Sequence, residues 1–293
     1  MDFKFESTAE EVTEGLDLTG KTYLVTGSNS GLGYESIRVL AMRGANIIAA
    51  ARTQEKAQHA LNELNIQGTA VACELSDLSS VRQAVSEIKA SGYKLDAIIA
   101  NAGIMALPEL QQKDGLELQF YTNHIGHFLL VTELVDQLTD QGRVVMLSSG
   151  AHYYAQDSGL ELDNLSGEHD YNDWRMYGRS KMANIQFANA LNKRFEGSNR
   201  RANSVHPGVI VTNLARHVPN KDQMYAQLKN RIKLKTLGQG AATQVLVATH
   251  PALQDVGGKY FSDCQISSTA PIAQDSAEAE ALWAFSVDFV STH

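Results

Sequence analysis

The sequence contains few of the residues that mark secreted, membrane-spanning or irregular proteins. Two cysteines, Cys73 and Cys264, occur in 293 residues, and their spacing fits neither a disulfide framework nor a CxxC motif. The five prolines are scattered, which excludes a Pro-rich linker. No run of about 18 apolar residues is present, which excludes a transmembrane helix. These absences predict a folded protein from a reducing compartment.

Positive charge is also scarce. Lys and Arg number 25 against 33 Asp and Glu, so the net charge is -8 and the surface as a whole repels nucleic acid and anionic lipid. Residues 1–20 are polar and acidic, with neither the basic start nor the apolar run of a secretory signal. We therefore expect a cytoplasmic protein that does not bind nucleic acid.

Short, nearly continuous apolar runs alternate with segments of helical length along most of the chain. Such runs are typical of strands that are buried on both faces of a parallel sheet. The runs cover residues 21–28, 45–52, 68–75, 95–103, 142–149, 201–208 and 258–264. About seven strands with crossover helices predict a single α/β domain over residues 1–293, a doubly wound parallel sheet with helices on both faces. Residues 1–17 would form an N-terminal extension, and residues 150–176 and 209–237 irregular loops.

A glycine-rich turn follows the first predicted strand. Glycines allow the backbone to turn tightly and approach a pyrophosphate, whose charge is favoured by the amides and dipole of the following helix. Taken alone the turn is weak support for a phosphate site, because ordinary strand-to-helix turns also contain glycine. Its residues are Gly27, Ser28, Asn29, Ser30, Gly31, Leu32 and Gly33.

Tyr177 and Lys181 are four residues apart in a helical segment, so their side chains would share one helix face. An ammonium group beside a phenol favours the phenolate and lowers the pKa of the phenol, which would make Tyr177 a general acid/base. Ser149 ends the fifth predicted strand, at the sheet edge where ligands bind, and would hydrogen-bond a substrate oxygen. The same Tyr/Lys spacing is also common on solvated helix edges.

Several short motifs, taken together and in order, resemble those of the short-chain dehydrogenases/reductases. After the glycine turn come Asn101-Ala102-Gly103, Asn123, Ser149, Tyr177-x-x-x-Lys181 and His206-Pro207-Gly208. The stretches DLTGKTYLVTGSNSGLG, TNHIGHFLL, YGRSKMANIQFANAL and GKYFSDC resemble the retinol dehydrogenase and carbonyl reductase branch. The resemblance implies a Rossmann-type fold and a nicotinamide-dependent oxidoreductase.

The resemblance also implies roles for individual residues. Asn123, Ser149, Tyr177 and Lys181 would be catalytic, with Lys181 also holding the nicotinamide ribose and Asn123 taking part in a proton relay. Ser148, which precedes the family's serine position, would be structural. Besides the glycine turn, Tyr177 and Lys181, the cofactor would contact Asn101, Ala102, Gly103, Pro207, Gly208, Val209, Ile210 and Thr212.

The end of the second predicted strand distinguishes two cofactors. A carboxylate there would bind the adenosine 2′-hydroxyl of NAD(H), but the chain has Arg52, whose planar guanidinium suits the 2′-phosphate of NADP(H). We therefore expect a preference for NADP(H), with NAD(H) as the alternative. The sequence also departs from the family pattern at two places near the expected cofactor site. Glu74-Leu75 stands where an Asp-Leu pair usually meets the adenine, and Ala100 replaces the first residue of Asn-Asn-Ala-Gly.

The interval between Ser149 and Tyr177 is longer than in the simplest family members and rich in aromatic residues. It would obstruct the usual tetramer interface, so we expect a monomer or homodimer. An aromatic surface beside the reacting carbon favours a lipophilic or aromatic substrate, although the loop could equally pack on its own rings. The candidate substrate residues are His152, Tyr153, Tyr154, Trp174 and Met176.

Residues 213–237 carry six cations against Asp222, a local charge of +5. Met224, Leu228 and Ile232 recur at intervals of four, as on an amphipathic helix. The resemblance places this segment within the substrate lid, residues 209–237. A solvated helix face is the favoured interpretation, and attraction of an anionic substrate or peripheral membrane contact is the alternative.

Three functions therefore stay open. The leading one is NADP(H)-dependent interconversion of a ketone or aldehyde, as a small-molecule substrate, with its alcohol. A carbon–carbon double-bond reductase resembling protochlorophyllide reductase is the enzymatic alternative. A non-catalytic dinucleotide-sensing protein is the third, although such proteins usually lack the Tyr/Lys pair. His124 and His127 have metal-ligand spacing, but no third ligand stands nearby, so we expect no metal site.

Overall fold

The strands of the central sheet bury side chains on both faces. The structure is a computed structural model that describes residues 2–293. In β1 (Thr22–Thr26), Leu24 packs into one apolar core while Tyr23 and Val25 pack into a second core on the opposite face. Successive strand residues point to opposite faces, so a strand that is apolar throughout requires helices on both sides.

Eight strands form the main sheet, in the order β10-β9-β8-β7-β4-β1-β2-β3. Neighbouring strands are parallel except β9 and β10, which form an antiparallel hairpin. The seven predicted strands are confirmed, and β10 is an eighth that is too short to show a sequence period. The other strands are β2 (Asn46–Ala51), β3 (Gly68–Ala72), β4 (Leu95–Ala100), β7 (Leu138–Leu147), β8 (Arg201–His206), β9 (Tyr260–Ser262) and β10 (Gln265–Ile266), and a separate hairpin pairs β5 (Gln112–Lys113) with β6 (Leu116–Glu117).

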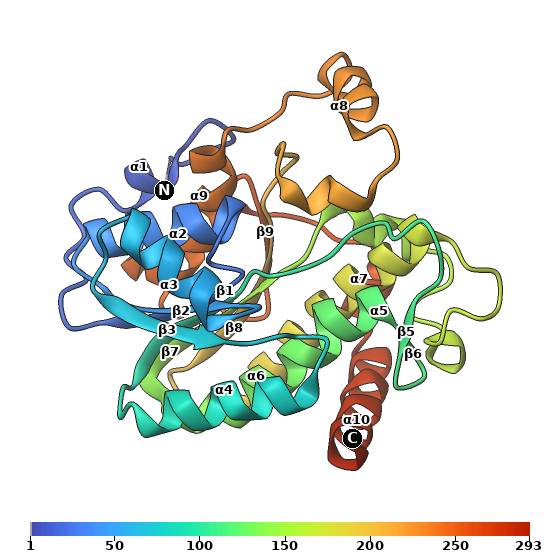
Figure 1. The fold of residues 1–293 in the computed structure, drawn as a ribbon, viewed down its shortest axis with the longest axis horizontal. Helices are drawn as coiled ribbons and strands as arrows, with labels where there is room; N and C mark the ends of the chain where they lie inside the picture. The colour runs from blue at the N-terminus through green and yellow to red at the C-terminus, as the bar shows by residue number, and fades with distance from the viewer. Residues whose placement is uncertain (1) are drawn as a thin grey trace.

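Helices cover both faces of the sheet, as the burial pattern requires (Figure 1). One face is covered by α1 (Ala9–Val12), α2 (Gly31–Met42), α3 (Gln54–Glu63) and α9 (Leu237–Thr249). The other face is covered by α4 (Leu78–Ala90), α5 (Leu118–Phe120), α6 (Gly126–Leu134), α7 (Asp173–Arg194) and α10 (Ser276–Thr292). The predicted N-terminal extension contains α1, whose Ala9 and Val12 are buried in the second of these cores.

The direction of the chain reverses at the centre of the sheet, between β1 and β4. From β1 the chain continues to β2 and β3 on one side, whereas β4 leads to β7 and β8 on the other. At such a switch point the connecting loops diverge, and a crevice opens at the carboxyl ends of the strands. The glycine turn after β1 and the 101–103 turn after β4 both begin at this crevice.

The two segments expected to be irregular contain short helices. Residues 150–176 hold the 3-10 helices η3 (Gly150–Ala155) and η4 (Leu162–Asn164). The lid holds the 3-10 helix η5 (Asn213–His217) and α8 (Lys221–Lys229), which projects from the body at the top of Figure 1. The predicted apolar stripe through Ile232 is wrong, because α8 ends at Lys229 and Ile232 is exposed beyond it.

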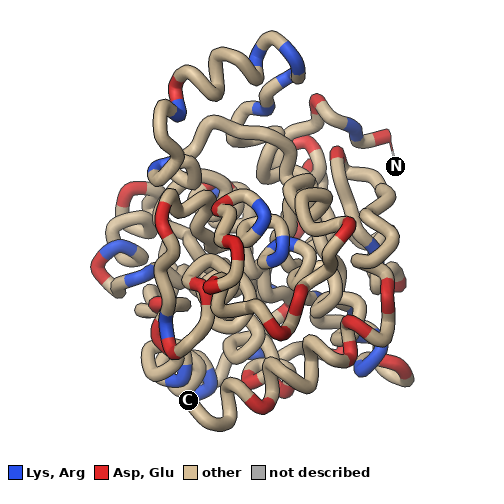
Figure 2. Tube along the Cα trace, turned by 90° about the vertical axis from the view of Figure 1, so that its right-hand side faces the viewer, with Lys and Arg blue, Asp and Glu red and all other residues tan. Residues whose placement is uncertain are grey.

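The positive charge of the lid is smaller than its sequence predicts. Figure 2 shows Lys and Arg along the projecting lid. Two of them are paired with residues outside it: Lys233 lies 2.8 Å from Glu6, and the buried Lys235 lies 2.6 Å from Asp263. The solvated face favoured from the sequence therefore includes Lys233, which is exposed in its pair, but not the buried Lys235, whose distant carboxylate partner is brought near only by the fold. Among the described residues no helix is both long and apolar enough to cross a membrane.

Candidate functional site

A cavity of about 890 Å³ lies at the crevice where the sheet reverses direction. Most residues expected to hold the cofactor line it: Gly27, Asn29, Ser30, Gly31, Leu32, Arg52, Glu74, Leu75, Asn101, Ala102, Gly103, Tyr177, Lys181, Pro207, Gly208, Val209, Ile210 and Thr212. Ser28 and Gly33 do not. Ser28 is buried and its hydroxyl donates to the Ala50 carbonyl at 3.1 Å. A side chain on Gly33 would overlap the carbonyl of Gly27. These two residues shape the turn.

The glycine turn requires glycine at two further positions. The φ angles of Gly27 and Gly31 are +66° and +57°, in the left-handed region that other residues rarely adopt. Between them, Asn29 and Ser30 line the cavity, and Ser30 is the residue before α2 begins. The turn therefore brings backbone to the cavity wall at a helix N-terminus, which suits a pyrophosphate.

The turn after β4 is held by a chain of hydrogen bonds. The Thr26 hydroxyl oxygen accepts the N–H groups of Asn101 at 2.9 Å and Ala102 at 3.0 Å, and the hydroxyl donates to His127 Nε2 at 2.9 Å. His127 Nδ1 in turn donates to the Asn123 carbonyl at 3.0 Å. Burial lowers the pKa of His127 to about 4, so it is neutral as this pattern requires. His127 is thus part of the scaffold, and the described residues contain no group of ligands suited to a metal.

Asn123 lies in η1 (Tyr121–Ile125), a π-helical turn. Its Oδ1 accepts the Ile104 N–H at 2.8 Å, and its Nδ2 donates to the Ile104 carbonyl at 2.9 Å and to Ser180 Oγ at 2.9 Å. The side chain therefore fixes the loop after β4 from behind the cavity. Single π turns occur frequently at functional sites.

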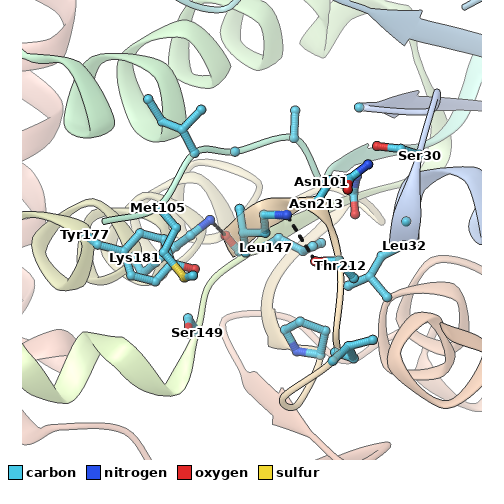
Figure 3. Close-up of a pocket in the computed structure, with 18 of the residues that line it drawn as sticks. Ser30, Leu32, Asn101, Met105, Leu147, Ser149, Tyr177, Lys181, Thr212 and Asn213 are labelled. Atoms are coloured by element: carbon cyan, nitrogen blue, oxygen red, sulfur yellow. Dashed lines mark hydrogen bonds between the residues drawn. The ribbon is translucent and has the colours of Figure 1, made fainter. Parts of the chain in front are cut away.

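Ser149, Tyr177 and Lys181 converge at one end of the cavity (Figure 3). Tyr177 and Lys181 belong to α7, and the Lys181 Nζ lies 5.6 Å from the centre of the Tyr177 ring. The ammonium donates to the Leu147 carbonyl at the end of β7, at 3.1 Å. Ser149 comes two residues after Leu147. The end of β7 and one face of α7 thus bring a hydroxyl, a phenol and an ammonium together.

Burial dominates the proton affinities of this group. It raises the pKa of Tyr177 to about 12, against the lowering effect of the Ser149 hydroxyl. It lowers the pKa of Lys181 to about 8, because the buried ammonium has lost its hydration. The prediction that Lys181 lowers the pKa of Tyr177 is therefore wrong for the protein by itself, because burial raises that pKa. At neutral pH Tyr177 is a phenol that can donate its proton.

The two adjacent serines have different partners. Ser148 is buried, and its hydroxyl donates to the Lys181 carbonyl at 2.7 Å. The Ser149 side-chain oxygen accepts the Ala151 N–H at 3.1 Å, which leaves its hydroxyl proton for another acceptor. Ser148 ties β7 to α7, whereas Ser149 is the serine with a donor to offer to a substrate.

Arg52 and Glu74, to which the sequence assigned separate roles, form an ion pair. The Arg52 Nε lies 2.8 Å from Glu74 Oε2, and the other carboxylate oxygen accepts the Ser76 hydroxyl at 2.8 Å. Both side chains line the cavity, and they follow β2 and β3, which lie across β1 and β4 from β7, so this end of the cavity is away from Tyr177.

The aromatic loop contributes two of its five candidate residues to the cavity. Tyr154 and Trp174 line it, with ring centres 6.0 Å apart, and Trp174 packs edge-on against Tyr177. The other three candidates do not line the cavity, so the expected substrate role is wrong for them. His152 is buried and bridges the Ser149 carbonyl at 2.7 Å and the Ala270 N–H at 3.1 Å. Met176 is buried in α7, and the Tyr153 hydroxyl reaches towards Ser268.

Sequence reasoning missed several residues that line the cavity. Lys56 lies four residues after Arg52, a spacing that could have drawn attention to it. Arg216 was counted in the charge of the lid but not placed in the site, since nothing in the local sequence shows which lid residues face inward. The other missed lining residues include Ile104, Met105, Thr122, Leu214, Met224, Tyr225 and Leu228.

Comparisons with known proteins agree with this geometry. The sequence profile of the family described as short chain dehydrogenase matches residues 21–159. The chloroplastic short-chain dehydrogenase TIC 32 A of Brassica napus is 39% identical over 98% of this chain and 93% of its own length. Retinol dehydrogenase 14 of Homo sapiens is 36% identical over 90% of this chain and 84% of its own. A crystal structure of an uncharacterized protein from Mycobacterium paratuberculosis superposes with a TM-score of 0.75 at 32% identity, covering 96% of this chain and 97% of that one.

Proposed function

The chain belongs to the short-chain dehydrogenase/reductase family, and we propose that it interconverts a ketone or aldehyde and its alcohol with NADP(H) as the preferred cofactor. The observation that carries this proposal is that one cavity is lined by both groups of residues. Ser149, Tyr177 and Lys181 stand at one end, and Arg52 with the glycine turn at the other. A dinucleotide with a reactive ring at one end and an adenosine phosphate at the other fits this arrangement.

The residues present suit such a cofactor. Gly27 and Gly31 bend the turn after β1 so that its backbone reaches the cavity. Lys181 is buried with three N–H donors, one of which goes to the Leu147 carbonyl, so the ammonium can also bind ribose hydroxyls. When bound, the nicotinamide would supply or accept the hydride.

Side chains of the protein would carry out the proton transfer. In carbonyl reduction, the Ser149 hydroxyl would hydrogen-bond the substrate oxygen and stabilise the charge that develops there. Tyr177 would donate its proton to that oxygen, and in alcohol oxidation it would take the proton back. Lys181 would stabilise the phenolate that donation leaves behind. Asn123 would hold the loop after β4 through its two hydrogen bonds to Ile104, and it would take part in the proton relay.

The substrate side of the cavity favours a lipophilic or aromatic carbonyl compound. Tyr154 and Trp174 form an aromatic wall beside Tyr177, and Met105, Leu214 and Met224 add apolar surface. Apolar walls with a few converging polar groups are typical of sites for small lipophilic molecules. The names of the retinol dehydrogenase relatives are consistent with a substrate of this class. A cytoplasmic location and a monomer or homodimer remain predictions.

Replacing the proposed acid/base tests the reaction. We expect Tyr177→Phe to lower turnover of ketones and aldehydes by about 10²-fold or more while NADPH still binds, because only the hydroxyl is removed. The matched control is Tyr153→Phe, since Tyr153 does not line the cavity. Retention of most activity in Tyr177→Phe would refute the assignment. Consumption of an enone double bond with no carbonyl reduction would instead identify a double-bond reductase.

A further inference from the structure

The end of the cavity away from Tyr177 contains more positive charge than one arginine provides. Among the described residues, the lining of the whole cavity includes four cations, Arg52, Lys56, Lys181 and Arg216, but only one carboxylate, Glu74. Of these cations, Lys181 belongs to the Tyr177 end. Glu74 is already paired with Arg52 at 2.8 Å, which offsets much of the charge of Arg52. A site at Arg52 would therefore depend on a further cation for a net positive charge.

Arg216 is a candidate for that cation, because it lines the same cavity. It comes from η5 in the lid, more than 160 positions along the chain from Arg52, yet both line the same cavity. Partial burial lowers the pKa of Arg216, and the charge of Arg52 lowers it further. Burial lowers the pKa of the neighbouring His217, and the charges of Arg216 and Arg52 lower it further. No carboxylate lies within ion-pair distance of Arg216 among the residues that the structure describes.

Two arginines that line one cavity, of which only Arg52 has a carboxylate partner, form a site for a doubly charged anion. Guanidinium groups bind phosphate oxygens through paired, charge-assisted hydrogen bonds. The cofactor phosphate that distinguishes NADP(H) from NAD(H) has this chemistry. We propose that Arg216 is a second specificity-determining residue, which binds the adenosine 2′-phosphate from the lid opposite Arg52.

The position of Arg216 links the phosphate to the substrate end of the cavity. Its neighbour Ala215 is fully buried in the small apolar cluster that contains Tyr177 and Met105, with Leu214 packed against it. One short turn thus carries a phosphate ligand and part of the wall beside the proposed acid/base. Binding of the 2′-phosphate to Arg216 would hold this turn in place, so NADP(H) would order the lid more than NAD(H) does.

The inference rests on the proposed NADP(H) preference, and binding measurements separate the two. Dissociation constants of NADPH and NADH would be measured for the wild type and for Arg216→Gln, Arg52→Gln and Lys229→Gln. Lys229 is a lid cation outside the cavity lining and serves as the matched control. We expect Arg216→Gln to weaken NADPH by about tenfold or more. NADH binding should change by less than about twofold, because NADH has no 2′-phosphate.

The possible outcomes assign failure to one proposal or the other. If Arg52→Gln abolishes the NADPH preference while Arg216→Gln leaves it intact, this inference is overturned and the cofactor proposal stands. If the wild type itself binds NADH as tightly as NADPH, the cofactor proposal fails with it. Arg216→Lys, which retains the charge, should recover part of the NADPH affinity, and an equal loss for NADPH and NADH in Arg216→Gln would indicate misfolding and contradict the assignment.

A second measurement reports on the lid directly. Trypsin cleavage after Lys221 and Lys229, followed by mass spectrometry, should be slowed more by NADPH than by NADH in the wild type. In Arg216→Gln the two cofactors should protect these bonds equally. Equal protection in the wild type would show that Arg216 does not connect the phosphate to the lid.

Discussion

Lys235 and Asp263 form an ion pair beneath the loop that follows β8. The Lys235 Nζ lies 2.6 Å from the Asp263 carboxylate, and the lysine side chain is fully buried. The alkyl chain of Lys235 packs against Gly208, and the backbone N–H of Lys235 donates to the Val209 carbonyl at 2.9 Å. Asp263 and Cys264 both have positive φ, 52° and 62°, in the two-residue turn between β9 and β10. The pair therefore connects a strained turn to residues that line the proposed cofactor site.

Removing one member of this pair should destabilise the protein. We expect Asp263→Asn to reduce the free energy of unfolding by on the order of 3 kcal/mol, because it leaves the Lys235 ammonium buried without a counter-charge. Urea unfolding followed by circular dichroism measures this. The control is Lys233→Met, since the Lys233–Glu6 pair is largely exposed and its loss should leave stability nearly unchanged. The double variant Lys235→Met with Asp263→Asn should recover much of the loss. A loss of stability in Lys233→Met as large as that in Asp263→Asn would contradict the assignment.

The adjacent serines provide a matched pair of variants. We expect Ser149→Ala to lower kcat for carbonyl reduction by about 10²-fold, because it removes the donor for the substrate oxygen. Ser148→Ala should instead lower the free energy of unfolding by about 1 kcal/mol, because it removes the hydrogen bond to the Lys181 carbonyl. Steady-state kinetics and thermal unfolding of both variants separate the two effects. The reverse pattern would move the proposed role to Ser148.

The two directions of the reaction should differ in pH dependence. Burial raises the pKa of Tyr177 to about 12, so the phenol needed for reduction predominates throughout the neutral range. We expect kcat for reduction to be flat between about pH 6 and pH 7 and to fall above that range as Lys181 loses its charge, and kcat for alcohol oxidation to rise with pH as the phenolate fraction grows. Saturating cofactor is needed, because the pKa of Lys181 is about 8 and its charge falls as the pH rises. A flat oxidation profile would mean that Tyr177 is not the base.

Neighbouring tyrosines test the substrate wall. Tyr154 lines the cavity and packs on Trp174, whereas Tyr153, the residue before it, does not line the cavity. We expect Tyr154→Ala and Trp174→Ala to raise KM for an aryl ketone by about tenfold, since each removes apolar contact area. KM for a small aliphatic aldehyde should change less, and Tyr153→Ala should leave both nearly unaltered. Equal effects on the two substrates would argue against an aromatic subsite.

Local patterns in the sequence were sufficient for the fold and for much of the site. The seven parallel strands could be predicted because buried strands are apolar on both faces, and each pattern lies within a few neighbouring residues. The glycine turn could be predicted because its backbone geometry excludes other residue types at Gly27 and Gly31. Tyr177 and Lys181 could be placed together because helical spacing alone puts them on one face.

Contacts between distant segments were decided by the tertiary structure alone. The sequence could not show that Arg52 pairs with Glu74, that His152 hydrogen-bonds the Ala270 N–H, or that Arg216 lines the same cavity as Arg52. It also did not reveal that Lys235 is buried against Asp263. Residue type and spacing determine which groups are available for chemistry. Their partners depend on how strands, loops and lid pack together, and that packing determines whether a charge is neutralised, buried or turned towards a ligand.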